Sequence, residues 1–125
     1  MIILAIETSC DETSVAILKA KGGLKNPSLK IMSNIVLSQI KTHAEWGGVV
    51  PSLAKREHSK NLIPILIKAL KKSKLLVSSK SQITNHKQIL NSILEREPEL
   101  LGQFLEFIPK IKTPKIDAIA VTVGP

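Results

Sequence analysis

Two short apolar runs flank a polar segment at the start of the chain, and they constrain its fold more than any other feature. The runs are residues 2–6 and 15–18, and residues 7–14 between them are mostly acidic or hydroxylated. Short, continuous apolar runs are typical of strands buried on both faces. We therefore predict a strand pair joined by a polar turn.

Further segments extend this sheet and place a helix against it. Residues 31–37 are rich in strand formers, and residues 116–123 form another apolar run with Asp117 near its start. Between them, Pro51 suits the first turn of a helix, and apolar residues recur at helical spacing as far as Ala69. A strand reached through a crossover helix usually runs parallel to the first strand. The order predicts an α/β fold that lacks its closing helices.

The predicted helix contains a proline and a strongly apolar second half. Pro64 removes a hydrogen bond and clashes with the carbonyl of Lys60, which predicts a kink or two abutting helices. Residues 62–67 are apolar nearly all round, more than one sheet face can cover. We therefore predict that residues 62–70 form an interface with a partner protein, and the competing explanation is that helices later in the chain fold back over them.

The stretch before the last strand has its own pattern. Residues 71–83 are polar and basic, which predicts a loop, and Asn85 with Gln88 resembles a helix capping box. Two short amphipathic helices are predicted next, the second restarting at Pro98. Their apolar stripes are Ile89, Leu90, Ile93 and Leu94, then Leu101, Phe104, Leu105 and Ile108.

Composition limits the function class. The chain carries 18 Lys and Arg against 10 Asp and Glu, a net charge of +8. This charge favours a polyanion such as RNA, although a solvated lysine-rich surface accounts for it equally well. The lone Cys10 cannot form an internal disulfide, which favours a reducing cytoplasm. The first apolar run is too short for a signal peptide or a membrane span.

The polar turn is the first candidate site. Successive N–H groups in a tight turn can hold a phosphate, and the hydroxyl of Ser9 adds a donor. Asp11 and Glu12 suit a metal that bridges to phosphate, or proton transfer in a nearby reaction. An ordinary acidic hairpin turn accounts for the same residues, since Asp, Ser and Thr are common in turns.

Residues 43–51 form the second candidate, read as a shaped loop with paired glycines. His43 could touch a substrate, but we favour the simpler interpretation, in which Trp46 is a core anchor and His43 a satisfied loop histidine. His43 and His58 lack the spacing of a metal pair on one helical face. We predict that His58 is packed and hydrogen-bonded. Cys10 has no recognisable base and is rejected as a nucleophile.

Three ordered motifs resemble the tRNA threonylcarbamoyladenosine transferase family. They are residues 6–16, the segment 38–58, and residues 117–125, which together cover most of the chain outside 71–114. Trp46 stands where the family usually has tyrosine, and Ser52 where it has glutamate. The stretch 75–112 is longer than the family's connection and resembles a helical insertion.

The resemblance implies the actin-like, Hsp70 and sugar-kinase fold of ribonuclease-H-like domains, with residues 1–125 as the N-terminal part of the first domain. It implies transfer of threonylcarbamoyl from threonylcarbamoyl-AMP to the adenosine next to the anticodon. Asp11 and Glu12 would line the reaction centre, Ser9 would hold phosphate or the adenylate, and His43 would approach the substrate. The family's divalent metal, iron or zinc, has its paired histidine ligands after the position of Pro125, so this chain supplies none.

The resemblance also implies partners. These are tRNA together with an actin-like partner subunit and an ATPase, or a homodimer, in the cytoplasm and without a membrane. Residues 1–125 alone are expected to be inactive, because they provide one side of a cleft. Two alternatives stay open: a non-catalytic actin-like partner subunit, which would be expected to lack the Asp11–Glu12 pair, and a phosphotransferase of the same fold. No nucleophile–base pair supports a protease.

Overall fold

Four strands form one mixed sheet in the computed structural model, which describes residues 1–23, 25–79 and 86–123. The strands are β1 (Ile2–Glu7), β2 (Glu12–Lys21), β3 (Ser28–Ser38) and β4 (Ala118–Val121), in the spatial order β3-β2-β1-β4. Strand β2 pairs antiparallel with both β1 and β3, whereas β4 runs parallel to β1. The predicted α/β class and parallel return strand are confirmed.

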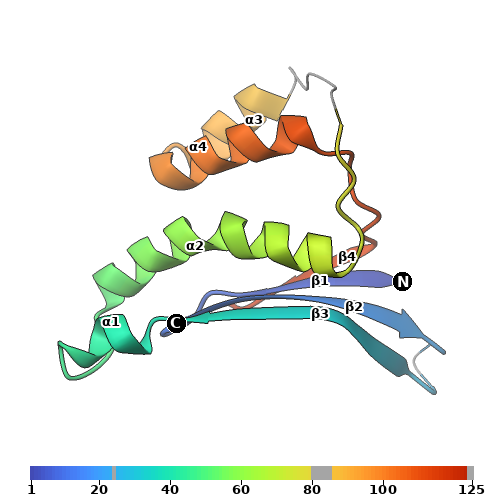
Figure 1. Cartoon of the computed structure of the whole chain (residues 1–125), viewed down its shortest axis with the longest axis horizontal. Helices are drawn as coiled ribbons and strands as arrows, with labels where there is room; N and C mark the ends of the chain where they lie inside the picture. Colours follow the sequence, from blue (N-terminus) through green and yellow to red (C-terminus); the bar gives the residue numbers. More distant parts are fainter. Residues whose placement is uncertain (24, 80–85, 124–125) are drawn as a thin grey trace.

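The helices lie on one face of this sheet (Figure 1). They are α1 (Ile40–Ala44), α2 (Pro51–Lys72), α3 (His86–Leu94) and α4 (Pro98–Phe107), followed by a short 3-10 turn, η1 (Ile108–Lys110). The segment predicted as a loop from residue 43 instead begins inside α1. The helices predicted around residues 89–94 and 101–108 are confirmed, while the capping residue Asn85 lies outside the described residues.

Strand β2 shows how the sheet is buried. Thr13, Val15 and Ile17 are buried, whereas the intervening Ser14 and Ala16 are only partly so. Alternate side chains of a strand point to opposite faces, so one face of β2 packs under α2. Burial of the first two strands on both faces was therefore wrong, because the described helices cover a single face (Figure 1).

The core lies between that face and α2. Leu4, Val15 and Ile17 from the sheet pack with Ile65, Ala69 and Leu70 from the helix, each at most 5% exposed. Burying an aliphatic side chain of this size stabilises the fold by about 1.5–3 kcal/mol. This packing fixes α2 over β2 and β3, and with it the orientation of the residues nearer its N-terminus.

Pro64 does not divide α2. The helix continues from Pro51 to Lys72 as one element, so the alternative of two abutting helices was wrong. Pro64 is exposed, and Figure 1 shows α2 arching over the sheet. A bend is the ordinary response of a helix to a residue that lacks an N–H and crowds the preceding turn.

The second half of α2 is covered from two sides within the chain. Ile65 faces the sheet core, while Ile63, only 3% exposed, lines a cleft of about 250 Å³ between α2 and the α4–η1 segment. Phe107 lines the same cleft from α4. The structure supports the competing explanation, in which the later helices fold back, and Ile63, which was expected to contact a partner, is buried beside them.

The base of the α3–α4 hairpin is fixed to the rest of the chain. The Ser79 amide donates to the Lys110 carbonyl at 2.8 Å, and the Lys112 amide donates to the Val77 carbonyl at 2.8 Å. Leu75 and Leu76 pack against the core, so the described part of the predicted 71–83 loop is anchored rather than free. That anchoring holds the hairpin above α2.

Candidate functional site

The turn between β1 and β2 is tied together by Glu7, the last residue of β1. Its carboxylate accepts hydrogen bonds from both the amide, at 2.7 Å, and the hydroxyl of Ser9. Cys10, exposed at the tip, has a φ of +50°, which non-glycine residues seldom adopt. The Asp11 carbonyl accepts the amide of Gln39 at 2.7 Å, joining the turn to the end of β3.

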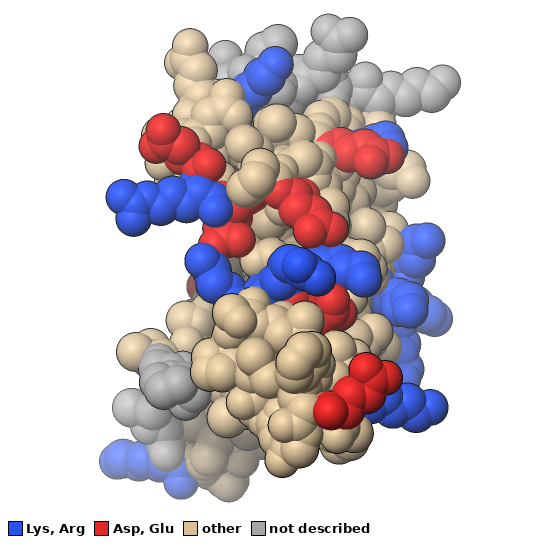
Figure 2. Space-filling view, turned by 90° about the vertical axis from the view of Figure 1, so that its left-hand side faces the viewer, with Lys and Arg blue, Asp and Glu red and all other residues tan. Residues whose placement is uncertain are grey.

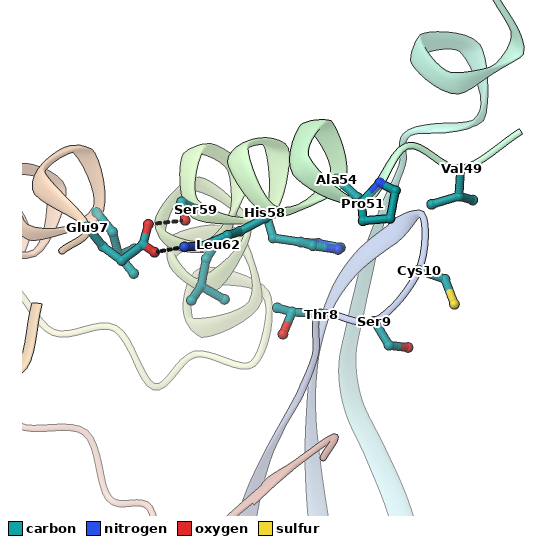
Figure 3. A pocket seen from close by; sticks show the side chains of 12 residues that line it. Thr8, Ser9, Cys10, Val49, Pro51, Ala54, His58, Ser59, Leu62 and Glu97 are labelled. Atoms are coloured by element: carbon teal, nitrogen blue, oxygen red, sulfur yellow. Dashed lines mark hydrogen bonds and ion pairs between the residues drawn. The ribbon is translucent and has the colours of Figure 1, made fainter. Parts of the chain in front are cut away.

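A pocket of about 480 Å³ opens beside this turn (Figure 3). The turn forms one wall, the first half of α2 forms another, and the α3–α4 hairpin contributes the residues at its far end. Its lining comprises Thr8, Ser9, Cys10, Val49, Pro51, Ala54, Lys55, His58, Ser59, Leu62, Glu97 and Leu100. Its walls are mostly apolar with a few polar groups, the usual character of a small-molecule site.

A hydrogen-bonded relay of three side chains lies behind the pocket, and one backbone amide fixes its polarity. The Val50 amide donates to His43 Nδ1 at 3.3 Å, so this nitrogen is an acceptor and the proton of the neutral ring is on Nε2. His43 Nε2 lies 2.9 Å from Gln39 Oε1 and donates to it. The Gln39 amide nitrogen therefore faces His58, 3.2 Å from Nδ1.

His58 ends the relay as an acceptor at one nitrogen. The Thr13 hydroxyl lies 2.8 Å from the same Nδ1 and competes with the Gln39 amide for its single lone pair. Since a neutral imidazole carries one proton, the proton of His58 is on Nε2. Thr13, Gln39 and His43 are buried, whereas His58 is partly exposed in the pocket wall. Figure 3 shows its ring reaching from α2 toward the turn.

Glu97 holds the hairpin at the far end of the pocket. Its carboxylate pairs with Lys55 Nζ at 2.8 Å and accepts the Ser59 hydroxyl at 2.9 Å. The hydrogen bond from Lys55, then that from Ser59, holds the pKa of Glu97 below its ordinary value. A third link joins the amide of Gln103 to the carbonyl of Lys60 at 3.2 Å. Side chains of the hairpin thus complete the pocket.

Charges of both signs meet where the hairpin approaches α2. Figure 2 shows basic and acidic side chains alternating across this face. Lys55, Arg56, Arg96, Glu97 and Glu99 line a second hollow there, of about 270 Å³. Opposite charges interleaved in this way do not form the continuous positive surface that tracks a nucleic-acid backbone. Where the hairpin approaches α2, basic side chains are therefore not gathered into a patch.

The structure separates the four predicted site residues. Ser9 lines the pocket, but both of its donors are directed to Glu7. Asp11 and Glu12 follow directly in the turn without lining the pocket, and Glu12 accepts the Ser38 hydroxyl at 3.4 Å. His43 is buried behind the pocket, at 3% exposure, and serves the relay.

Other residues depart from the sequence reading or were missed by it. Trp46 is 68% exposed, so its interpretation as a core anchor was wrong. His58 is hydrogen-bonded as predicted, but it also lines the pocket. Sequence reasoning missed Gln39 and Glu97, which have partners on α2, and it missed Glu7, whose partner Ser9 follows two residues later. Only Glu7 carried a local signal, an acid two residues before a serine in a turn.

The described residues offer neither a cluster of metal ligands nor a helix that could span a membrane. No group of three or more His, Cys, Asp or Glu side chains in this part of the chain is arranged to hold a metal ion. None of the described helices has the length and apolar character needed to cross a membrane.

A family model and the similar known proteins carry the same description. A sequence model described as tRNA N6-adenosine threonylcarbamoyltransferase matches residues 30–85. Proteins with that name are similar to the chain in Persephonella marina, 55% identical over 73 residues, and Prochlorococcus marinus strain MIT 9312, 49% over 83 residues. These alignments cover 58% and 66% of this chain, but only 19% and 22% of the relatives. The resemblance to the tRNA N6-adenosine threonylcarbamoyltransferase family is confirmed over these aligned residues, which span about a fifth of the relatives' length.

Proposed function

We propose that this chain is the donor-binding part of a tRNA N6-adenosine threonylcarbamoyltransferase. The observation that carries the proposal is the pocket beside the β1–β2 turn, since the turn is one of the three motifs and the pocket adjoins it. The pocket has the size of a small-molecule site, and its lining combines apolar walls with hydroxyl groups and His58. The family resemblance supplies the ligand, threonylcarbamoyl-AMP.

The reaction assigns roles to the turn. The adenosine amino group attacks the carbamoyl carbonyl carbon, the bond from that carbon to the phosphate oxygen breaks, and AMP leaves. The proton lost by the amine requires an acceptor, for which we propose Asp11 or Glu12. Ser9 would contact the adenylate after its hydroxyl leaves Glu7, and His43 would act from behind the pocket through Gln39.

The other members of the proposal rest on the family alone. The first is the actin-like fold, with residues 1–125 in its first domain and residues 75–112 as an insertion. The second is the set of partners, which are tRNA together with an actin-like subunit and an ATPase, or a second copy of the chain. The third is the cytoplasm as the location. An iron or zinc ion is proposed for the full-length protein only, with no ligands from this chain, whose described residues bring no set of metal ligands together. No step is assigned to that metal.

A chimera tests the proposal. The part of the Persephonella marina protein that corresponds to β1 through α2 would be replaced by those residues of this chain, and threonylcarbamoyladenosine in tRNA measured by mass spectrometry. We expect activity from the chimera, and a loss of at least about a hundredfold in Asp11→Ala or Glu12→Ala, typical of a general acid–base residue. Lys68→Ala, an exposed change on α2, is the matched control.

The outcomes separate the alternatives. Each acidic variant should cost less than about 0.5 kcal/mol of stability, so lost activity would not reflect unfolding. Near-normal activity in both variants would show that the turn is structural only. A folded but inactive chimera would favour the non-catalytic partner.

A further inference from the structure

We propose that His58 presents its Nε2–H group to an anionic oxygen of the ligand in the pocket beside the β1–β2 turn. This inference deepens the proposed function and rests on it for the ligand class, an adenylate that carries a phosphate and a carboxylate. It concerns a residue that none of the predicted roles includes. The hydrogen bonds that run from the Val50 amide through His43 and Gln39 to His58 support it.

The donor and acceptor at each hydrogen bond of the relay follow from the Val50 amide, which can only donate. A backbone N–H is always a donor, so the Val50 amide makes His43 Nδ1 an acceptor. If Gln39 were turned over, its NH₂ group would face the protonated Nε2 of His43, and two donors would meet at 2.9 Å. The observed orientation of Gln39 therefore pairs a donor with an acceptor at both histidines, and it makes His58 Nδ1 the acceptor.

The remaining nitrogen of His58 is the group left for a ligand. Its ring lies in the pocket wall with Thr8, Ser9 and Cys10 opposite (Figure 3). Among the hydrogen bonds of the described residues, those of this ring go to Nδ1. A fixed N–H donor in a largely apolar wall suits a charged oxygen, because hydrogen bonds to ionised groups are the stronger ones.

The buried relay behind the ring makes this donor a positioned one. Thr13 is fully buried and Gln39 is 2% exposed, so neither can turn toward water to release the ring. Leaving a buried donor or acceptor without a partner costs about 1–3 kcal/mol, which opposes rotation of His58. The pocket therefore receives a donor whose direction is set before the ligand arrives.

Two substitutions distinguish the acceptor role of His58 Nδ1 from the donor role of its Nε2. In His58→Asn, the side-chain oxygen can accept from Thr13 and Gln39 in place of Nδ1, but nothing replaces Nε2–H. In His58→Gln, the longer amide can place an N–H group near the position of Nε2. Binding of AMP, N-carbamoylthreonine and adenosine to the full 125-residue chain would be measured by NMR titration.

We expect His58→Asn to lose about tenfold or more in affinity for AMP, N-carbamoylthreonine or both, the range for a hydrogen bond to a charged group. His58→Gln should stay within about threefold of the parent, and adenosine should bind all three proteins alike. The AMP and N-carbamoylthreonine arms distinguish phosphate from carboxylate as the acceptor. An equal loss in both variants, no loss in either, or no binding of either anionic probe overturns the proposal.

A second measurement is independent of ligand and of folding in the variants. In the parent chain labelled with ¹⁵N-histidine, long-range proton–nitrogen spectra should show His58 protonated on Nε2, and protonation on Nδ1 would overturn the proposal. The chimera assay stands apart from both tests. An inactive chimera with the expected binding pattern would reject the transferase function alone, and an active chimera without that pattern would reject the role of His58 alone.

Discussion

Replacement of Ile63 by alanine should lower the free energy of unfolding of the chain by roughly 2–4 kcal/mol. The side chain is 3% exposed and lines the cleft between α2 and the α4–η1 segment. The change removes three carbon atoms, and at about 0.8 kcal/mol for each buried CH₂ group the transfer loss alone is about 2.4 kcal/mol. Incomplete collapse of α4 onto the smaller side chain adds the rest.

Urea denaturation followed by far-ultraviolet circular dichroism measures this change in the isolated chain. Lys68→Ala, exposed on the same helix, is the control and should stay within about 0.5 kcal/mol of the parent. If a partner protein were the real cover of this part of α2, Ile63→Ala would behave like the control in the absence of that partner. Such a result, with an unchanged urea slope, would refute the packing of α4 on α2.

Three other perturbations test the relay, the hairpin contact and a turn. Gln39→Leu should destabilise the chain by about 1–3 kcal/mol, because it leaves the buried N–H of His43 without an acceptor; a loss below about 0.5 kcal/mol in urea would contradict the relay. The pKa of Glu97 is lowered in the folded chain, so its stabilising contribution is present above the unfolded value near 4.5 and is lost as the pH falls through the folded value. Urea midpoints of parent and Glu97→Gln should accordingly differ near neutral pH and converge in acid, whereas a pH-independent difference would reject this ion pair. Gly22→Ala, whose Cβ would fall 2.0 Å from a backbone oxygen at φ +86°, should lower thermal stability more than Gly23→Ala, which has φ +64° and open space; equal losses would count against this turn geometry.

Local patterns predicted most of the elements. Short apolar runs identified the strands, and Pro51 marked the start of α2, because hydrophobic burial and backbone geometry act over a few residues. The parallel β4 followed from the handedness of crossover connections. The burial of β1 and β2 was misjudged, since a continuous apolar run does not reveal whether one or both faces are covered.

The candidate site was predicted only where its residues are adjacent in sequence. The turn could be identified, but the relay could not, because Gln39 and His58 are 19 positions apart and meet only when α2 packs on the sheet. Glu97 is 38 positions from Ser59 and reaches it through the hairpin. Such contacts depend on how elements pack, which periodicity does not specify. Trp46 was misread because its size favours burial, yet its segment lies outside the core.

The parallel pairing of β1 with β4 has a consequence for the order in which the molecule assembles. The Ile2 amide and the Asp117 carboxylate that it contacts are 115 positions apart, and closing a loop of that length costs roughly 4 kcal/mol plus a constant. Strands β1 to β3 need no such closure, so β4 should dock last and detach first. The Thr8 amide donates to the Thr122 hydroxyl at 3.3 Å, just beyond β4. Amide exchange at Thr8, in the wall of the pocket, should therefore report the opening of a strand from the far end of the chain.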